Sequence, residues 1–288
     1  MRHIKTLLLS MVAAILVGCG TTSTVPITGR KQHLMVSDEQ VNAMALQQYQ
    51  QTLKQSRLST NATNTAMVKR VGQRLATAVT NYLNQNGLGA EVKNYAWEFN
   101  LVQDNQVNAW CMPGGKIVVY EGLLPVTQNE ASLAIVLGHE IAHAVAKHSA
   151  EQLSNAYKNQ YGTQLLGAVL QGTGLSQETQ QLLALGQSLG AKLWTSGFSR
   201  KQESEADHMG LIFAAMAGYD PQVATSFWQR MASQGTGSFS LFSDHPSDAD
   251  RIKNIQAWMP EALKYYKPVT TTTTTSSAKK KTSAKKKK

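Results

Sequence analysis

Two histidines four residues apart, and the glutamate beside the first of them, carry the most specific chemistry in this sequence of 288 residues. His139 and His143 share one face of any helix that contains them, so both imidazoles can reach a single Zn²⁺ ion. Glu140 can reach a water molecule bound to that ion. The alternative is an ordinary helix whose His and Glu side chains face solvent. The spacing and the residue types together favour a catalytic zinc site with one ion per chain.

A catalytic zinc site also needs a third protein ligand and an open position for water. A histidine six residues after His143 would serve, but that position is Ser149. His148 does not fit, because at about 100° per residue it would point away from the face that carries the other two histidines. We therefore expect His148 to be a structural or surface residue and the third ligand to come from another element.

The best source of that ligand is the acidic segment at residues 200–207. Glu203 and Asp207 are four residues apart and share a helical face, which suits one carboxylate on the metal and one behind it, orienting a ligand imidazole. Glu205 lies on a different face. Taken alone, Glu203 would be a solvated acidic residue, but beside a helix with metal ligands we interpret it as the third ligand.

The elements that must position these residues are mainly helical. A capping-box spacing at residues 127–130 precedes the apolar helix that contains the two histidines, and a second helix covers about 200–217 and stops at Gly218. Alternating apolar residues predict a strand at 97–101, and two more strands at 108–112 and 116–120 flank a Pro-Gly-Gly turn. Further helices are predicted in four places, after residues 37 and 220, around 68–82 and after 247, with loosely specified helices between 157 and 197. The pattern predicts an α+β domain in which helices surround a small sheet.

Three separated motifs resemble one known family. They are Gly-His-Glu-Ile-Ala-His at 138–143, the run from Phe-Ser-Arg into Glu-Ser-Glu-Ala-Asp at 198–207, and Asp-His-Pro at 244–246 followed by Arg251. In this order they resemble the zinc metallopeptidases related to the CAAX prenyl proteases and the heat-shock membrane protease, in particular their soluble bacterial periplasmic members. The resemblance covers most of residues 37–263. It implies a predominantly helical, zincin-type metallopeptidase domain with a small sheet.

The resemblance also implies a role for each matching residue. The zinc ion would be bound by His139, His143 and Glu203. The general base would be Glu140. The residues behind the ligands would be Asp207 and Arg251. The edge strand that holds the substrate backbone in such gluzincins would be formed by Asn108, Ala109 and Trp110.

His245 lies in a short Ser-Asp-His-Pro-Ser loop, and the equivalent histidine of the resembling family lies close to the metal. It would donate a hydrogen bond to the oxyanion of the reaction, or it would occupy the open coordination position and hold the enzyme latent. A third alternative is a loop histidine bonded only to nearby backbone. We predict a catalytic role for His245, with transition-state stabilisation ahead of latency.

The N-terminal segment reads as an export signal and an anchor. Residues 1–18 have basic residues followed by a short apolar run, which is typical of a signal peptide. The sequence Leu-Val-Gly-Cys ends at Cys19 and resembles the bacterial lipobox, so residues 19–36 are predicted to be a lipid anchor and flexible linker. The alternative is a plain signal peptide that leaves Cys19 as a free thiol. Because Gly20 is not aspartate, a Gram-negative host would place the lipoprotein in the periplasm at the outer membrane.

Most of the net charge of +10 lies in the two termini and not in the predicted folded domain. Nine of these charges come from Arg2, Lys5 and seven lysines between Lys279 and Lys288, in stretches that contain no acid. A near-neutral body argues against a nucleic-acid-binding surface. Residues 266–288 are predicted to form a disordered Thr/Lys-rich tail after a metallopeptidase domain at 37–265. The tail is either a solvated segment or a polybasic contact with anionic lipid or envelope polymer.

We therefore predict a zinc-dependent endopeptidase of the bacterial cell envelope that hydrolyses unfolded or misassembled envelope proteins. No mature hydrophobic run is long enough to span a bilayer, so prenyl-protein processing is not carried over from the membrane-embedded relatives. One alternative is an envelope chaperone or adaptor that binds zinc without turnover, and another is a lipid-anchored scaffold without metal. Glu140 favours the enzyme, because a structural zinc site does not require a base at that position.

Overall fold

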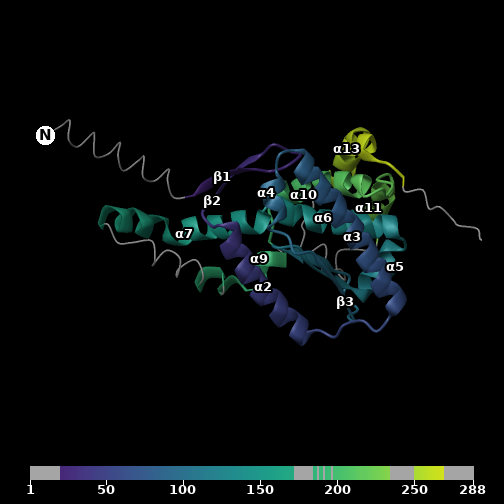
Figure 1. The fold of residues 1–288 in the computed structure, drawn as a ribbon, viewed down its shortest axis with the longest axis horizontal. Coiled ribbons are helices and arrows are strands. Elements are labelled where there is room, and N and C mark those ends of the chain that lie inside the picture. The colour runs from purple at the N-terminus through teal and green to yellow at the C-terminus, as the bar shows by residue number, and fades with distance from the viewer. Residues whose placement is uncertain are drawn as a thin grey trace, which may run out of the picture.

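The computed structural model describes residues 20–171, 184–186, 188–190, 192–195, 197–233 and 250–268. Within them, helices surround a sheet of three strands, as Figure 1 shows. This confirms the predicted α+β class. The described elements contain no helix long and apolar enough to cross a membrane. The predicted signal peptide, Cys19, His245 and all but the first residues of the predicted tail lie outside the described residues.

The three-stranded sheet has the order β3-β5-β4. Its strands are β3 (Glu98–Val102), β4 (Ala109–Met112) and β5 (Lys116–Tyr120). The central strand β5 pairs antiparallel with β4 and parallel with β3. Alternate residues of β4 point to opposite faces, and both faces are covered, so every residue of this strand is buried. The three strands and the turn between β4 and β5 lie where the sequence predicts them.

Eleven helical segments surround the sheet in the described part of the chain. Those before the histidine motif are α2 (Asp38–Gln55), α3 (Ala62–Gln85), α4 (Gly89–Val92), the 3₁₀ turn η1 (Glu121–Leu123) and α5 (Leu124–Thr127). The others are α6 (Glu130–Val145), α7 (His148–Gln171), α9 (Lys192–Thr195), α10 (Arg200–Met216), α11 (Val223–Ser233) and α13 (Arg251–Tyr265).

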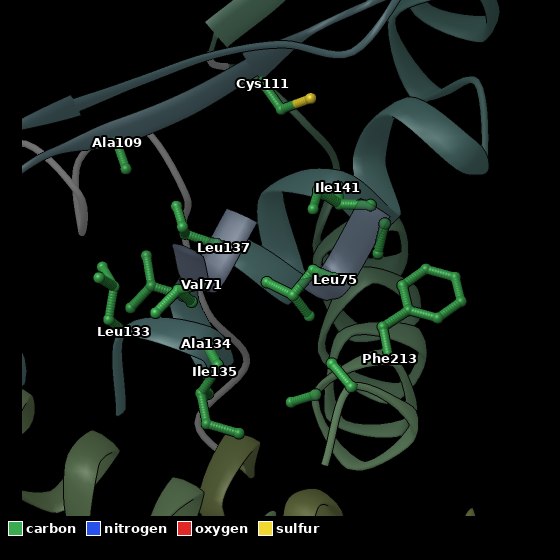
Figure 2. Close-up of a cluster of buried hydrophobic side chains, with 14 of the residues drawn as sticks. Val71, Leu75, Ala109, Cys111, Leu133, Ala134, Ile135, Leu137, Ile141 and Phe213 are labelled. Carbon is green, nitrogen blue, oxygen red and sulfur yellow. The ribbon is translucent and has the colours of Figure 1, made fainter. Parts of the chain in front are cut away.

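Helix α6 runs through the centre of the core. It is buried from Ser132 to Val145 and packs against α3, α10 and strand β4. Figure 2 shows its apolar residues meeting Val71 and Leu75 of α3 and Phe213 of α10. Burial on all sides explains why the histidine motif sits in an apolar helix without a strong polar face. A motif in this place is held rigidly on every side.

The start of α6 differs from the prediction. Thr127 does not cap this helix, because it is the last residue of α5 and its hydroxyl donates to the Leu124 carbonyl. Gln128 then adopts a left-handed conformation that separates the two helices. Asn129 is the N-cap of α6, and its side chain accepts a hydrogen bond from the Ser132 backbone N–H.

Within the predicted anchor and linker at residues 19–36, the expectation of a flexible linker is wrong for the described residues 20–36. This segment forms an antiparallel hairpin from β1 (Thr21–Thr24) and β2 (Lys31–Leu34), which packs on α7. Val25, Leu34 and Val36 are buried, so the segment has enough apolar surface to dock on the domain. The folded unit therefore begins before the predicted boundary at Ser37.

Candidate active site

The three predicted metal ligands come together in the buried interior between two helices. Successive turns of α6 place His139 and His143 on one face, and α10 supplies Glu203. The Nε2 atoms of the two histidines are 3.1 Å apart. Glu203 Oε2 lies 3.3 Å from His139 Nε2, and Glu203 Oε1 lies 3.5 Å from His143 Nε2.

These separations match a tetrahedral zinc site. Ligands at about 2.0–2.1 Å from a tetrahedral ion lie about 3.3 Å from each other. The three side chains also form the group of possible metal ligands found among the described residues. Two imidazoles and one carboxylate are a donor set that catalytic zinc uses, with the fourth position left for water. The residues present therefore fit a zinc ion, as the sequence predicts.

Two glycines allow the ligand helices to approach closely. A Cβ on Gly138 would lie 2.6 Å from the carbonyl oxygen of Gly210, and a Cβ on Gly210 would lie 2.6 Å from the backbone nitrogen of His139. Any larger residue would therefore push α6 and α10 apart. The backbone contact lies next to the first ligand, so it sets the distance between the histidines and Glu203.

A carboxylate holds the first histidine from behind. Asp207 Oδ1 lies 2.9 Å from His139 Nδ1, so the ring presents Nε2 to the metal position. Arg251 at the start of α13 donates to Asp207 Oδ2 at 2.6 Å and to Glu203 Oε2 at 3.3 Å. The Arg251 guanidinium stacks on Trp228, 4.0 Å from the ring centroid. The structure thus places Asp207 behind His139, and Arg251 against both Asp207 and Glu203.

The charge around His139 favours its protonated form when no metal competes. Burial alone would lower the pKa of this ring, but the hydrogen bonds and negative charges of Asp207 and Glu203 outweigh burial and raise the pKa to about 10. Binding of a metal at neutral pH must therefore displace a proton from this site.

A second imidazole holds the other histidine. Helix α6 ends at Val145, and Lys147 adopts a positive φ of 58° before α7 begins. This break turns His148 back toward the site, where its Nδ1 lies 2.8 Å from His143 Nδ1. The expectation that His148 points away is wrong, because it assumed one continuous helix. His148 is fully buried, so of the two expected alternatives the surface residue is wrong.

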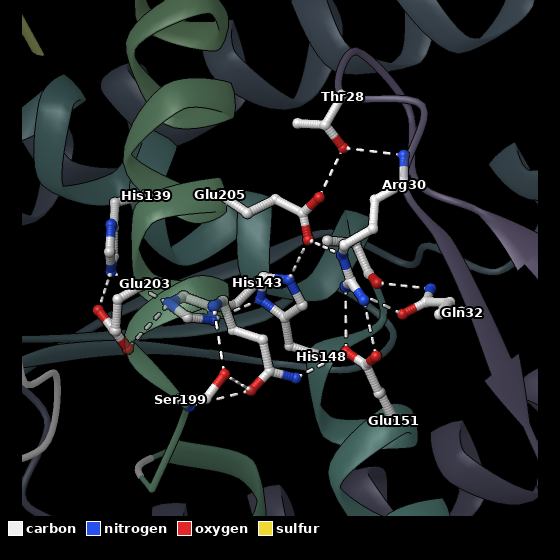
Figure 3. A network of polar contacts seen from close by, with 12 residues as sticks. Thr28, Arg30, Gln32, His139, His143, His148, Glu151, Ser199, Glu203 and Glu205 are labelled. Atoms are coloured by element: carbon white, nitrogen blue, oxygen red, sulfur yellow. Dashed lines mark hydrogen bonds and ion pairs between the residues drawn. The ribbon is translucent and has the colours of Figure 1, made fainter. Parts of the chain in front are cut away.

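His148 is in turn bound to Glu205. Its Nε2 lies 3.0 Å from Glu205 Oε2, and Thr28 and Arg30 of the hairpin also donate to that carboxylate, as Figure 3 shows. Burial alone would raise the pKa of Glu205, but these three hydrogen bonds lower it to about 2. Burial lowers the pKa of His148. The pair is therefore a neutral imidazole beside an ionised carboxylate.

Glu140 directly follows the ligand His139 on α6. It is buried on the α6 turn that faces strand β4, and its charge adds to burial in raising the pKa of the Cys111 thiol on that strand. The Glu140 carboxylate thus lies near Cys111 of the predicted substrate strand.

The predicted substrate strand is found at an edge of the sheet. Ala109 and Trp110 belong to β4, and Asn108 precedes it. Among the described residues, no strand pairs with the outer edge of β4. The Trp110 indole donates to the Tyr120 hydroxyl at 3.2 Å and packs edge-on against Tyr49. Its side chain thus belongs to the core, so any contact of this strand with a peptide must involve the backbone.

The sequence interpretation missed the residues behind His143. They are Thr28, Arg30 and Glu151. His148 was expected to be a structural or surface residue, and Glu205 was placed on another face but given no role. The signal for the hairpin was weak but present: a Thr-rich run, a Pro-x-x-Gly turn and a second apolar run. No local pattern linked Arg30 to an acid on a distant helix.

The fold and the site define a zincin-type metallopeptidase, with two histidines and a glutamate from a second helix around a zinc position. Residues 62–259 match Peptidase family M48, and the chain belongs to this family. This confirms zinc as the cofactor and zinc metalloendopeptidase as the class of enzyme.

Curated relatives give the same class. The chain is 34% identical to the mitochondrial metalloendopeptidase OMA1 of Schizosaccharomyces pombe, over 83% of this chain and 66% of that protein. It is 38% identical to the Arabidopsis thaliana protein of the same name, over 62% of this chain and 36% of that protein. It is 26% identical to the beta-barrel assembly-enhancing protease of Escherichia coli O157:H7, over 62% of this chain and 38% of that protein. The chain thus spans between about a third and two thirds of the length of these relatives.

Proposed function

We propose that this protein is a zinc-dependent endopeptidase of the bacterial cell envelope that cleaves unfolded or misassembled envelope proteins. The observation that carries the enzymatic part is the meeting of His139, His143 and Glu203 at zinc-site distances, with Glu140 beside them. The envelope part rests on the resemblance of the motifs and on the similarity to a protease named for beta-barrel assembly.

Each residue of the site has a role in hydrolysis. A zinc ion at this site supplies Lewis-acid polarisation and lowers the pKa of water to about 7. Glu140 accepts the proton of the attacking water and then delivers it to the leaving amine. Asp207 and Arg251 keep the ring of His139 and the carboxylate of Glu203 in place. A binding protein without turnover would not require a base at Glu140.

The substrate would lie extended along the outer edge of β4. Asn108, Ala109 and Trp110 would pair with the peptide backbone by strand addition. Because the side chains of this strand are buried, recognition would depend little on the substrate sequence. Broad specificity for extended, unfolded segments follows, which suits quality control.

The variant Glu140→Gln tests the enzymatic part. We expect it to keep a normal zinc content and to lose hydrolysis of an unfolded protein such as casein, because the ligands remain while the proton acceptor is gone. Retained turnover would contradict the assignment of Glu140. Accumulation of particular envelope proteins in a strain that carries this variant would identify the natural substrates.

His245 is proposed to act in the same reaction, although it lies outside the described residues. If it stabilises the oxyanion, His245→Ala lowers turnover by about 100- to 1000-fold. If it holds the enzyme latent, the same change raises basal hydrolysis. An unchanged rate with unchanged zinc would assign His245 to the loop structure alone.

We also propose that Cys19 is lipidated and anchors the protein at the periplasmic face of the outer membrane. Cys19→Ser should then release the protein from the membrane fraction and abolish labelling by a fatty-acid probe. Unchanged fractionation would favour a plain signal peptide. We propose the Lys-rich tail as a second contact with the anionic envelope, so deletion of residues 279–288 should weaken binding to anionic vesicles.

A further inference from the structure

The hydrogen bond between two imidazoles behind the site determines where the protons lie. His143 presents Nε2 to Glu203 and His139, so this nitrogen needs its lone pair for the metal. Its proton must then be on Nδ1, which lies 2.8 Å from His148 Nδ1 and donates to it. His148 consequently carries its own proton on Nε2 and donates it to Glu205 Oε2 at 3.0 Å. With a metal on His143 Nε2 and both rings neutral, this is the arrangement of protons that satisfies these contacts.

The carboxylate at the end of this chain is fixed by the N-terminal hairpin. Thr28 Oγ1 donates to Glu205 Oε1 at 2.5 Å, and Arg30 Nε donates to Glu205 Oε2 at 2.7 Å. The other side of the Arg30 guanidinium binds both oxygens of Glu151, at 2.7 and 3.0 Å. Glu205 is nearly inaccessible to solvent, so its charge depends on these donors. The hairpin thereby contacts the carboxylate that binds His148, the ring behind His143.

We propose that His148, Glu205 and Arg30 are positioning residues for zinc: they hold the ring of His143 in the tautomer and orientation that metal binding requires. This inference rests on the proposed zinc peptidase and extends its site to a segment that begins at β1. Removing an outer partner of a metal-binding histidine lowers metal affinity by about 10- to 100-fold. Here the carboxylate acts through an intervening imidazole, so the expected loss is near the lower end.

The decisive comparison is between the two carboxylates that share Arg30. Glu205→Gln removes the charge that orients His148, whereas Glu151→Gln removes a charge that binds the same arginine but does not contact His148. Both changes weaken the docking of the hairpin. The dissociation constant for Zn²⁺ is measured on the full chain by competition with a chelator, and the melting temperature is measured on the zinc-free protein.

We expect Glu205→Gln to weaken zinc binding by about tenfold and Glu151→Gln by less than about threefold. The melting temperatures of the two zinc-free variants should fall by similar amounts. His148→Ala should weaken binding at least as much as Glu205→Gln. His148→Gln, which can still accept from His143 and donate to Glu205, should restore part of it. In the Co²⁺-substituted protein, the visible absorption bands should shift in Glu205→Gln and not in Glu151→Gln, because they report the geometry of the ligands.

The contribution of the hairpin is tested by Arg30→Gln, alone and together with Glu205→Gln. The double variant should bind zinc about as weakly as Glu205→Gln alone, because both changes act through one chain of hydrogen bonds. Equal zinc affinities of Glu205→Gln, Glu151→Gln and the unaltered protein would overturn the positioning role. So would equal losses in Glu205→Gln and Glu151→Gln. Failure of the unaltered protein to bind zinc would instead contradict the zinc site itself.

Discussion

His139 is held from behind by a carboxylate that touches its ring, whereas His143 is held by a second imidazole whose carboxylate lies one side chain further away. The first support comes from α10 and α13, on the same side as Glu203. The second joins α6 to α7 and to the N-terminal hairpin. Both supports use a carboxylate of α10, but only the support of His143 extends to α7 and to the N-terminal hairpin.

The two supports differ in how distant the residues are on which the geometry of each ligand histidine depends. On the Asp207 side, one helix delivers both a ligand and the partner of another ligand, so the support is short. On the His148 side, the support ends at residues that are 177 and 175 positions before Glu205 in the chain. Disturbance of the hairpin should then reach the metal position, although no hairpin residue is a ligand.

The largest effect is expected from the ligand that faces both histidines. Glu203→Ala leaves both supports intact but removes one of three protein donors. Zinc affinity should fall by more than about 100-fold, the upper limit for outer partners, and hydrolysis should fall with it. Metal content and casein cleavage measure the two losses. A normal zinc stoichiometry would show that another residue completes the site.

The direct support should matter more than the indirect one. Asp207→Asn removes the charge next to His139 and the ion-pair partner of Arg251, so zinc affinity should fall by several tens of fold. The matched control is Glu261→Gln, which makes the same chemical change beside His208 of the same helix but away from the site. A smaller loss in Asp207→Asn than in Glu205→Gln would reverse the order of the two supports.

A larger residue at the close contact between α6 and α10 should disturb the supports of His139 and His143 equally. In Gly210→Ala the new Cβ would meet backbone atoms of Gly138 and His139, which cannot turn aside as a flexible side chain can. The free energy of unfolding should fall by about 1–3 kcal/mol, with weaker zinc binding. Gly89→Ala is the control, because its Cβ would approach only the end of the Asn84 side chain. Chemical denaturation of the two variants gives the comparison.

The smallest effect on zinc affinity is expected from Phe198, because its contact with a ligand histidine is the stacking of its ring. The Phe198 ring stacks on His143 with centroids 4.2 Å apart and is buried. Phe198→Leu should cost about 1 kcal/mol of stability and change zinc affinity by less than about threefold, because no hydrogen bond is lost. A tenfold loss of affinity would show that stacking, rather than the contact with His148, orients His143.

The sequence by itself determined the local parts of this site. Helical spacing put His139 and His143 on one face, with Glu140 next to the first, and it paired Glu203 with Asp207. Alternation of apolar residues located β3. The family motifs indicated the zinc chemistry, and the family match confirms it. These signals are readable because each depends on neighbours within a few residues.

The tertiary structure alone decided the support of His143 and the place of the N-terminal segment. A positive φ at Lys147 ended α6 and reversed the direction of His148, which periodicity cannot reveal. Arg30 found its partners on α7 and α10, although no pattern in the sequence couples it to them. A buried charge must be paired with another, and the residue that pairs with it is set by the packing of distant elements. The zinc ligands were local enough to predict, and the contacts that hold one of them were not.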